Sequence, residues 1–503
     1  MFINKILKTP IYNIVKKTEL QYASILSEKI NNNIYFKRED QQIVKSFKIR
    51  GAHQFISNLS KCDLNKGVIA ASAGNHAQGV ALSAKHYNIN STIVMPIVTP
   101  SIKWESVKKL DSKIILYGDT FDEAYNFAKD MAIDNNKIFI PPFDDINIIA
   151  GQATIAMEIC NDWDFTNKNL DIIFVQIGGG GLIAGISKYI KELYPNIKII
   201  GVESIGATSM STSIKENKIT TLDYIDTFAD GVAVKTIGTI PFDYTKKYVD
   251  DIIQCTNDEI CEAIQYIYEE NRTIVEPAGA LSTAGLLKYC KQYNLTNKNV
   301  ISILSGSNVN FTRLRYIAER SVQNEILLSV KIPEEPGSLH KFCNLLESPN
   351  ISEFNYRCSD NSNAYIFVGI YLDDFANKID IINKLNKNNY KTIDISDNEL
   401  AKNHIRYQVG GKCNIYSKEL LYSFEFPERQ NALLDFLIKL SKISQNKWNI
   451  TQFHYRNSGS SIAQVLCGLH IPESDITLFE KFLNNLSYNY KNETDNIVYK
   501  QFN

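Results

Sequence analysis

Short apolar runs alternate with amphipathic stretches through most of residues 33–304. The runs 67–71, 91–95 and 171–177 are almost continuously apolar, and each is followed by a loop and a stretch with helical spacing. Apolar runs of this length are typical of strands that are buried on both faces, as in parallel sheets covered by helices. The pattern therefore predicts an α/β fold with parallel sheets and helices on their faces.

The alternation also gives the expected elements. The predicted strands are 33–36, 67–71, 91–95, 113–117, 171–177, 198–202 and 300–304, and the predicted helices are 51–59, 80–87, 121–135 and 183–193. Three of the strands run into polar or glycine-rich loops, at 72–79, 178–182 and 305–308. These strand ends are the candidate places for chemistry.

The pattern changes near residue 325. Residues 325–332 alternate between apolar and polar, which predicts a half-buried strand. The octapeptide 350–357 (NISEFNYR) returns 99 residues later as 449–456 (NITQFHYR), and a strand, a proline and a helix are expected before each copy. Such repetition predicts two duplicated modules that contain βαβ elements.

Composition excludes several classes of protein. A chain of 503 residues with 44% hydrophobic and 22% charged residues predicts a soluble protein of two to four domains. A net charge of −1 gives no general attraction to nucleic acid or to an anionic membrane. The nine cysteines form no C-x-x-C pair and are odd in number, so we expect neither a metal site nor disulfides, and a cytoplasmic location. An apolar run of about 20 residues, which a membrane helix needs, is absent from the sequence.

The glycine run 178–181 is the clearest chemical signal. It follows a buried strand and opens a helix, so main-chain N–H groups and the helix dipole converge on one point, which suits a phosphate. No Gly-Lys-Ser/Thr follows, and Leu182 and Ile183 stand where G-x-G-x-x-G would need glycine. A flexible turn is the alternative, but four glycines in a turn carry a large entropic cost without a ligand.

A lysine completes the signal. Lys48 lies in the segment SFKIRGA (46–52), and a phosphate loop without a nucleotide motif together with such a lysine points to pyridoxal phosphate. Asn75 and Ser305 lie at strand ends, from which they could bond the cofactor's 3-hydroxyl and its pyridine nitrogen. Taken singly, either residue is more often a capping or turn residue.

Six segments in one order carry a resemblance to a known family. The chain resembles biosynthetic threonine dehydratase (threonine ammonia-lyase), a pyridoxal-phosphate enzyme of fold type II, in segments 46–52, 72–79, 178–182, 228–235, 276–280 and 304–308. The repeated tail is similar to the two ACT-like regulatory modules of that family. The resemblance implies a catalytic domain at 1–320 with parallel sheets in two subdomains, and two α+β modules at 325–397 and 420–491.

The resemblance also implies residue roles. Lys48 would condense with the cofactor aldehyde and act as the catalytic base, Asn75 would hold the 3-hydroxyl, and Ser305 would face the pyridine nitrogen. The phosphate would be held by Gly178, Gly179, Gly180, Gly181 and Leu182. The substrate carboxylate would be bound by main-chain groups of Ser72, Ala73, Gly74, Asn75 and His76.

Three further residues keep two interpretations each. Phe47 is either a residue that packs on the cofactor or an ordinary core aromatic. Glu276 and Asp230 are either functional or serve as helix caps and structural hydrogen-bond partners.

The activity that the resemblance implies is conversion of L-threonine to 2-oxobutanoate and ammonia, the first committed step of isoleucine biosynthesis. Isoleucine would inhibit and valine would counteract it, in a homotetramer. Two positions depart from the family pattern. The first module has Pro336-Gly337 where the second has Gln430-Asn431, which weakens the expectation of an effector site there, and Thr18-Glu19-Leu20 replaces Thr-Pro-Leu, where we expect only a local change in the loop.

Other enzymes share the fold and remain as alternatives. Threonine synthases carry aspartate after the lysine, where this chain has Ile49, and racemases and catabolic dehydratases lack two tail modules. Serine dehydratase, serine racemase and cysteine synthase are the remaining enzymes, and both threonine and serine are compatible with the motifs as substrates. A catalytically inert amino-acid sensor is the alternative of another class.

Overall fold

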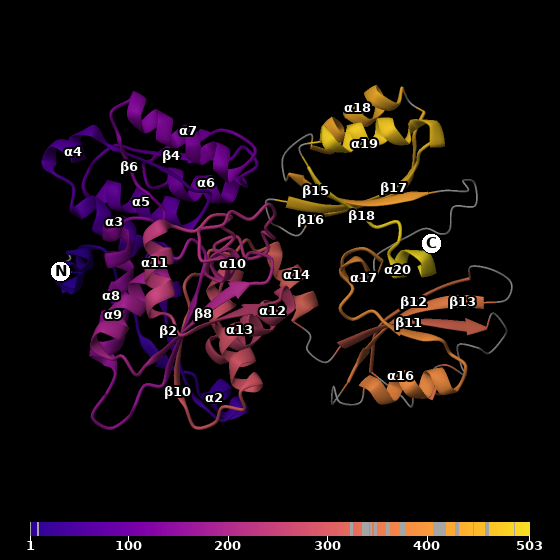
Figure 1. Cartoon of the computed structure of the whole chain (residues 1–503), viewed down its shortest axis with the longest axis horizontal. Helices are drawn as coiled ribbons and strands as arrows, with labels where there is room; N and C mark the ends of the chain where they lie inside the picture. Colours follow the sequence, from indigo (N-terminus) through magenta and orange to yellow (C-terminus); the bar gives the residue numbers. More distant parts are fainter. Residues whose placement is uncertain are drawn as a thin grey trace. The chain divides into compact units, whose positions relative to one another are not determined.

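The chain divides into two compact units, residues 1–321 and 322–503 (Figure 1). The computed structural model describes residues 2–7, 10–321, 325–333, 342, 345–346, 350–358, 363–372, 378–405, 419–427, 432–445, 447–457, 462–486 and 488–502. The turns at Pro336-Gly337 and Gln430-Asn431, on which the expectation of a weakened effector site depends, lie outside the described residues.

The N-terminal unit is built on a six-stranded sheet in which all strands are parallel except the edge strand β1. Its order is β1 (Leu20–Tyr22), β2 (Asn33–Lys37), β10 (Asn299–Ile303), β7 (Ile172–Gln176), β8 (Lys198–Ser204) and β9 (Asp251–Cys255). Side chains of β7 alternate between two cores, with Phe174 in one and Ile173 and Val175 in the other. The sheet is therefore buried on both faces, as the continuous apolar runs predicted.

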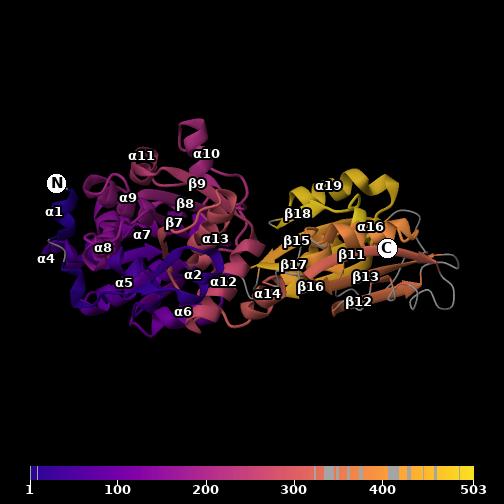
Figure 2. The same cartoon turned by 90° about the horizontal axis from the view of Figure 1, so that it is seen from below.

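Helices cover the two faces of this sheet. The helices α8 (Ile146–Asp162) and α9 (Gly181–Leu193) contribute to one core, and α12 (Asn257–Asn271) and α13 (Pro277–Gln292) contribute to the other. In Figure 2 strands β7 and β8 lie between these two pairs of helices. The shorter helical segments of the unit are α1 (Phe2–Leu7), η1 (Ile11–Asn13), α2 (Ser24–Ile30), η2 (Glu39–Gln41), α4 (Lys61–Lys66), α6 (Ser101–Lys108), α10 (Ser209–Glu216), α11 (Thr239–Tyr248) and α14 (Arg313–Arg320).

A second, smaller sheet is entirely parallel. Its order is β5 (Lys113–Leu116), β4 (Ser91–Met95), β3 (Val68–Ala71) and β6 (Ile138–Phe139). Helices α3 (Lys48–Ser57) and α5 (Asn75–His86) pack on one face, and α7 (Phe121–Asp134) packs on the other. The loops that follow β3 and β7 thus come from different sheets of the same unit.

The predicted strands lie within two residues of the observed ones, but two helices were predicted to begin too late. Helix α3 begins at Lys48 instead of 51, and α5 begins at Asn75 instead of 80. Two glycines near these helix starts allow close packing of the helices. A Cβ on Gly51 would lie 2.3 Å from the Gln152 side chain on α8, and a Cβ on Gly79 would lie 3.2 Å from the backbone of Ile49.

The C-terminal unit contains two modules with the same topology. Each has a four-stranded antiparallel sheet, in the order β12-β13-β11-β14 and β16-β17-β15-β18. The strands are β11 (Glu325–Pro333), β12 (Asn350–Cys358), β13 (Asn363–Tyr371), β14 (Thr392–Asp394), β15 (Leu420–Pro427), β16 (Asn449–Asn457), β17 (Ile462–His470) and β18 (Asn489–Asn492). The repeated octapeptides lie on β12 and β16, and both strands shift register at the same point of the repeat. The predicted duplication is confirmed.

Each module has its own helices and core. The helices are α16 (Lys378–Lys387), α17 (Glu399–Asn403), α18 (Ala432–Ser444), η5 (Glu473–Asp475), α19 (Ile476–Asn484) and α20 (Ile497–Phe502). In the second module α18 and α19 cover one face of the sheet (Figure 1), where Phe436 packs against Phe424, Phe426 and Phe482.

Residues 325–332 form a strand, as predicted, but the prediction that this strand is half-buried is wrong. Both faces of β11 are buried, because Leu328 and Val330 belong to the core of the first module while Leu327 belongs to a further core. That further core joins the modules, with Phe367 of β13 and Leu466 of β17 among its members. The alternation in the sequence missed this because the outer face is covered by residues far along the chain, such as Ile395 and Leu466.

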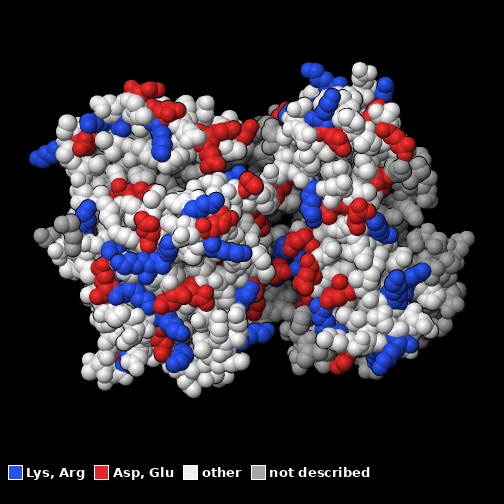
Figure 3. All heavy atoms as spheres, in the orientation of Figure 1, with Lys and Arg blue, Asp and Glu red and all other residues white. Residues whose placement is uncertain are grey.

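Charge is mixed over the surface that Figure 3 displays, where Lys and Arg alternate with Asp and Glu, in keeping with the net charge of −1. Within the described residues, no helix is both long enough and apolar enough to cross a bilayer.

Candidate active site

Lys48 lies at the first position of α3, directly after Phe47, whose main-chain N–H donates to the Ser305 carbonyl at 3.0 Å. The Lys48 Nζ donates to the Pro142 carbonyl at 3.0 Å. Burial lowers the pKa of Lys48 to about 8, against the opposing effect of the Glu276 charge. Lys48 is therefore an amine that loses its proton near neutral pH, as nucleophiles and general bases require.

The glycine loop connects β7 to α9. Gly180 has φ of +90°, a left-handed conformation that favours glycine. A Cβ on Gly179 would lie 2.2 Å from Cδ1 of Phe143, so the loop fits against that ring only as glycine. Phe143 follows Pro142, which bonds Lys48, and this contact brings the loop and the lysine together. No side chain caps α9, so the N–H groups of its first turn are available to an anion.

Asn75 lies at the start of α5 and is held by two side chains. Its Nδ2 donates to Glu276 Oε1 at 2.6 Å, and its Oδ1 accepts from Asn308 Nδ2 at 2.7 Å. Asn308 Nδ2 also donates to the Val44 carbonyl at 2.8 Å. The amide of Asn75 is thereby fixed in one orientation, with one N–H left over.

Ser305 is 2% exposed and follows β10, and its Oγ donates to the Ala278 carbonyl at 3.4 Å. Phe47 is half-buried and contributes to the edge of the core around α8 and α9, while its ring lies 5.5 Å from Lys48 Nζ. Both interpretations of Phe47 are compatible with this position.

The loop 72–76 ends β3 and opens α5. Gly74 N–H donates to Ser72 Oγ at 3.2 Å, and no side chain caps the helix. His76 is buried and its Nε2 lies 3.1 Å from the Ile140 carbonyl, so this nitrogen carries the proton. Burial and then the Lys48 charge lower the pKa of His76 to about 3, which keeps the imidazole neutral. The main-chain N–H groups at this helix start suit a carboxylate.

The structure separates the two acids whose roles were open. Glu276 occupies the N-cap position of α13 but makes no capping hydrogen bond, and its carboxyl bonds Asn75 instead. Asp230 lies outside any helix and pairs with Lys103 at 2.7 Å and Arg313 at 3.5 Å. Neither acid caps a helix. The partners Lys103 and Arg313 gave no sequence signal, whereas Asn308 lay in a recognised motif without an assigned role.

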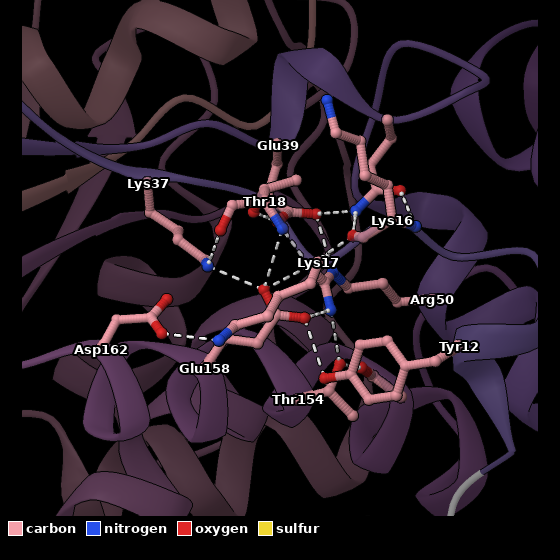
Figure 4. A network of polar contacts seen from close by, with 12 residues as sticks. Tyr12, Lys16, Lys17, Thr18, Lys37, Glu39, Arg50, Thr154, Glu158 and Asp162 are labelled. Atoms are coloured by element: carbon pink, nitrogen blue, oxygen red, sulfur yellow. Dashed lines mark hydrogen bonds and ion pairs between the residues drawn. The ribbon is translucent and has the colours of Figure 1, made fainter.

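A buried ionic network surrounds Arg50, a residue of α3 (Figure 4). Arg50 bonds both Glu39, at 2.7 Å, and Glu158, at 2.6 Å, and Lys37 pairs with Glu158 at 2.7 Å. Thr18 donates to Glu39 at 2.5 Å, while the neighbouring Glu19 side chain is exposed, so the departure from Thr-Pro-Leu falls on the surface side of this loop. Sequence reasoning missed the network because its members lie up to 140 residues apart.

Comparison with known proteins adds an independent line. The family model described as pyridoxal-phosphate dependent enzyme matches residues 11–306, and that of the C-terminal regulatory domain of threonine dehydratase matches 317–405 and 411–502. The biosynthetic L-threonine dehydratase IlvA of Pasteurella multocida is 46% identical, covering 100% of this chain and 97% of that protein. The chain belongs to the threonine dehydratase family. The predicted family, fold class and pyridoxal-phosphate dependence are thus confirmed.

Solved structures agree with this family. The processed form of threonine deaminase isoform 2 from Solanum lycopersicum is similar with a TM-score of 0.62 and 44% identity, over 64% of this chain and 92% of that chain. Maize serine racemase is similar with a TM-score of 0.58 and 31% identity, over 62% of this chain and 95% of that one.

The residues present fit pyridoxal phosphate. The glycine loop turns through the left-handed conformation of Gly180, and the uncapped start of α9 that follows it offers N–H donors. Lys48 provides a readily deprotonated amine, Asn75 has a second N–H that can donate a hydrogen bond, and Ser305 provides a buried hydroxyl. These are the phosphate, aldehyde and ring contacts that the cofactor requires.

Proposed function

We propose that this chain converts L-threonine to 2-oxobutanoate and ammonia, as the first committed step of isoleucine biosynthesis. The observation that carries the proposal is the Lys48 amine, with its pKa lowered to about 8, beside the uncapped glycine loop and the fixed Asn75 amide. The Pasteurella relative, aligned over the whole chain, is named for this dehydration.

In this proposal, each group acts on one part of the reactants. Bound pyridoxal phosphate supplies an electron sink for charge that develops at the substrate's α-carbon. The phosphate is held by the main chain of 178–182, the ring nitrogen by Ser305, and the 3-hydroxyl by Asn75. Ser305 is uncharged, so it does not favour a protonated ring nitrogen, and this weaker sink favours elimination over transamination.

Lys48 Nζ takes the α-proton of the substrate, and the β-hydroxyl takes up a proton and leaves as water. The enamine that is released then takes up one water and yields 2-oxobutanoate and ammonia. An ordinary lysine, with a pKa near 10.4, would be almost fully protonated at neutral pH. Burial of Lys48 removes most of that penalty. The N–H groups of residues 72–76 bind the substrate carboxylate at the start of α5, where the helix dipole adds attraction.

Replacement of Lys48 tests the assignment. Lys48→Ala should abolish formation of oxoacid from threonine, together with the visible absorbance of the lysine-bound cofactor. Lys61→Ala, on the surface at the start of α4, is the matched control and should change neither. Retained turnover in Lys48→Ala would falsify the role of this residue.

The substrate is tested by comparing threonine with serine in the same assay, and by following D-serine formation. A preference for threonine supports the proposal, while racemisation or a preference for serine supports the same-fold alternatives. The matched regulatory domain at 317–405 and 411–502 favours the dehydratase, because that family model is described as the regulatory domain of threonine dehydratase. A colourless, inactive protein would instead be the inert sensor.

We propose further that the C-terminal modules bind isoleucine, which inhibits, and valine, which counteracts inhibition. The support is the match to the regulatory domain of threonine dehydratase over both modules. Titration of isoleucine against initial rate tests this, and a flat response would remove regulation from the proposal. The domain boundaries 1–320, 325–397 and 420–491 belong to the same proposal.

Assembly and location complete it. A homotetramer should scatter light with about four times the 57.1 kDa mass of the chain, and a mass of one or two chains would contradict it. Cytoplasmic location is supported by the free thiols of five described cysteines, Cys62, Cys160, Cys255, Cys290 and Cys467.

A further inference from the structure

Glu276 is an acid whose side chain is turned toward the site. It is 4% exposed and occupies the N-cap position of α13. The short polar side chains that usually occupy this position accept hydrogen bonds from the first turn of the helix. Glu276 makes no such bond, and it accepts instead from Asn75, 201 residues earlier in the chain.

The neighbouring amides determine how Asn75 is oriented. The Val44 carbonyl can only accept, so the Asn308 group that faces it must be Nδ2. The other N–H of that Nδ2 donates to Asn75, whose facing atom must therefore be Oδ1. The Asn75 Nδ2 then points to the Glu276 carboxyl, with one N–H given to the acid and one remaining.

We propose that Glu276 is a positioning residue, which holds the Asn75 amide so that its remaining N–H is presented to the 3-oxygen of bound pyridoxal phosphate. This inference rests on the proposed function in one respect, namely the assignment of Asn75 to that oxygen. Without the acceptor on Glu276, the Asn75 side chain is held only through Asn308 and can rotate away.

The carboxyl of Glu276 is itself held firmly. The main-chain N–H of Glu276 donates to the Gly306 carbonyl at 3.1 Å. A Cβ on Gly306 would lie 2.6 Å from Glu276 Oε1, and a Cβ on Gly231 would lie 3.5 Å from it. Two glycines thus leave room for the carboxyl, and larger residues at these positions would displace it.

The hydrogen bond does not depend on the charge of Glu276. Burial, followed by the Asp230 charge, raises the pKa of Glu276 to about 7, against the effects of Asn75 and Lys103. A protonated carboxyl still has an acceptor oxygen, so it can bond the Asn75 Nδ2 in either state. The acceptor, and not the negative charge, is the feature that the proposal requires.

The proposal is tested by substitutions of Glu276 that change the side chain's bulk and its hydrogen-bond acceptor separately. Glu276→Gln keeps an acceptor oxygen, whereas Glu276→Leu keeps the bulk and removes the acceptor. The dissociation constant of pyridoxal phosphate is measured by cofactor fluorescence for these full-length variants, for Glu276→Ala, for Asn75→Ala and for the double variant Glu276→Leu with Asn75→Ala. Far-UV circular dichroism selects the folded variants.

We expect Glu276→Leu and Glu276→Ala to weaken cofactor binding about tenfold or more, as loss of a buried hydrogen-bond partner does. Glu276→Gln should stay within about threefold of the native protein. The double variant should bind no more weakly than Asn75→Ala alone, because both changes remove the same contact.

Native affinity for pyridoxal phosphate in Glu276→Leu would overturn the proposal. It would also be overturned if the double variant lost affinity by the product of the two single losses, because an acid with a merely structural role would act independently of Asn75. If neither apolar variant folds, a tenfold loss in Glu276→Gln overturns it as well. The measurement uses no substrate, so failure to convert threonine would count against the proposed function alone.

Discussion

Removal of Arg50 is the sharpest test of the buried ionic network that surrounds this residue of α3. The guanidinium is fully buried and binds the carboxyls of Glu39 and Glu158 with four short hydrogen bonds. Arg50→Met keeps a long side chain and leaves both acids with Lys37 as the remaining buried cation of the network. Two buried carboxylates would then share one positive charge.

The expected cost is large. Breaking a buried ion pair by removing one partner costs about 3–5 kcal/mol, because the remaining charge is uncompensated. For a unit of 321 residues, this loss lowers the unfolding temperature by roughly 4–7 °C at about 2.1 cal/mol/K of unfolding entropy per residue. Arg50 lies in the first turn of α3, which also carries Lys48, so its loss should weaken binding of the cofactor as well.

The loss should depend on pH. Although burial acts in the opposite direction, Arg50 and then Lys37 hold the pKa of Glu158 below its usual value. A lowered carboxyl pKa stabilises the fold above the unfolded value, near 4.5, and that contribution disappears as pH falls through the folded value. The deficit of Arg50→Met should therefore be full at pH 7.5 and should shrink only as the pH falls below about 4.5, through the lowered pKa of Glu158.

Calorimetry at one fixed protein concentration measures these shifts, because assembly also changes the unfolding temperature. Lys85→Met is the matched control, since Lys85 pairs with Asp111 at 2.8 Å with side chains that are 48% and 76% exposed. Such a surface pair contributes at most about 1 kcal/mol. A shift for Arg50→Met no larger than that of the control would refute the reasoning.

Three other outcomes are expected. Covalent binding of pyridoxal phosphate to the apoprotein should accelerate with pH around a midpoint near 8, where Lys48 becomes neutral, and a midpoint near 10 would contradict the burial of its amine. Gly179→Ala should weaken the cofactor about tenfold by contact with the Phe143 ring, and Phe143→Ala in the same chain should restore part of the affinity measured by fluorescence. Leu466→Ala, in the core that joins the two modules, should cost about 2–5 kcal/mol in denaturant unfolding of the C-terminal unit, whereas Leu478→Ala, 42% exposed, should leave the midpoint nearly unchanged.

The sequence was most informative where one local pattern determines the structure. The run 91–95 coincides with β4, because a strand buried on both faces is mostly apolar, as Ile93, Val94 and Met95 are here. The glycine loop after β7 was likewise recognisable, since the strand, the glycines and the helix are consecutive. The resemblance then gave Lys48, Asn75 and Ser305 their expected roles.

Contacts between distant segments could not be predicted in this way. The Glu276–Asn75 bond spans 201 residues, and the interpretation of Glu276 as a helix cap suggested nothing of it. The full burial of β11 depends on Leu466 and other residues of the second module, which leave no trace in the local alternation of β11. The starts of α3 and α5 were predicted too late for the same reason, because the residues that pack against Gly51 and Gly79 lie elsewhere in the chain.

The order of strands in the large sheet has a consequence for synthesis of the chain. Strand β2, at residues 33–37, lies between β1 and β10, and β10 is formed by residues 299–303. On a ribosome that adds roughly 5–20 residues per second, β2 therefore waits about 13–50 s for its parallel neighbour. The small sheet, drawn entirely from residues 68–139, needs no later segment to complete its strand pairing. During translation the small sheet can form first, while the N-terminal strands and the Glu39–Arg50 pair stay without their partners on β10 and α8 until those segments emerge.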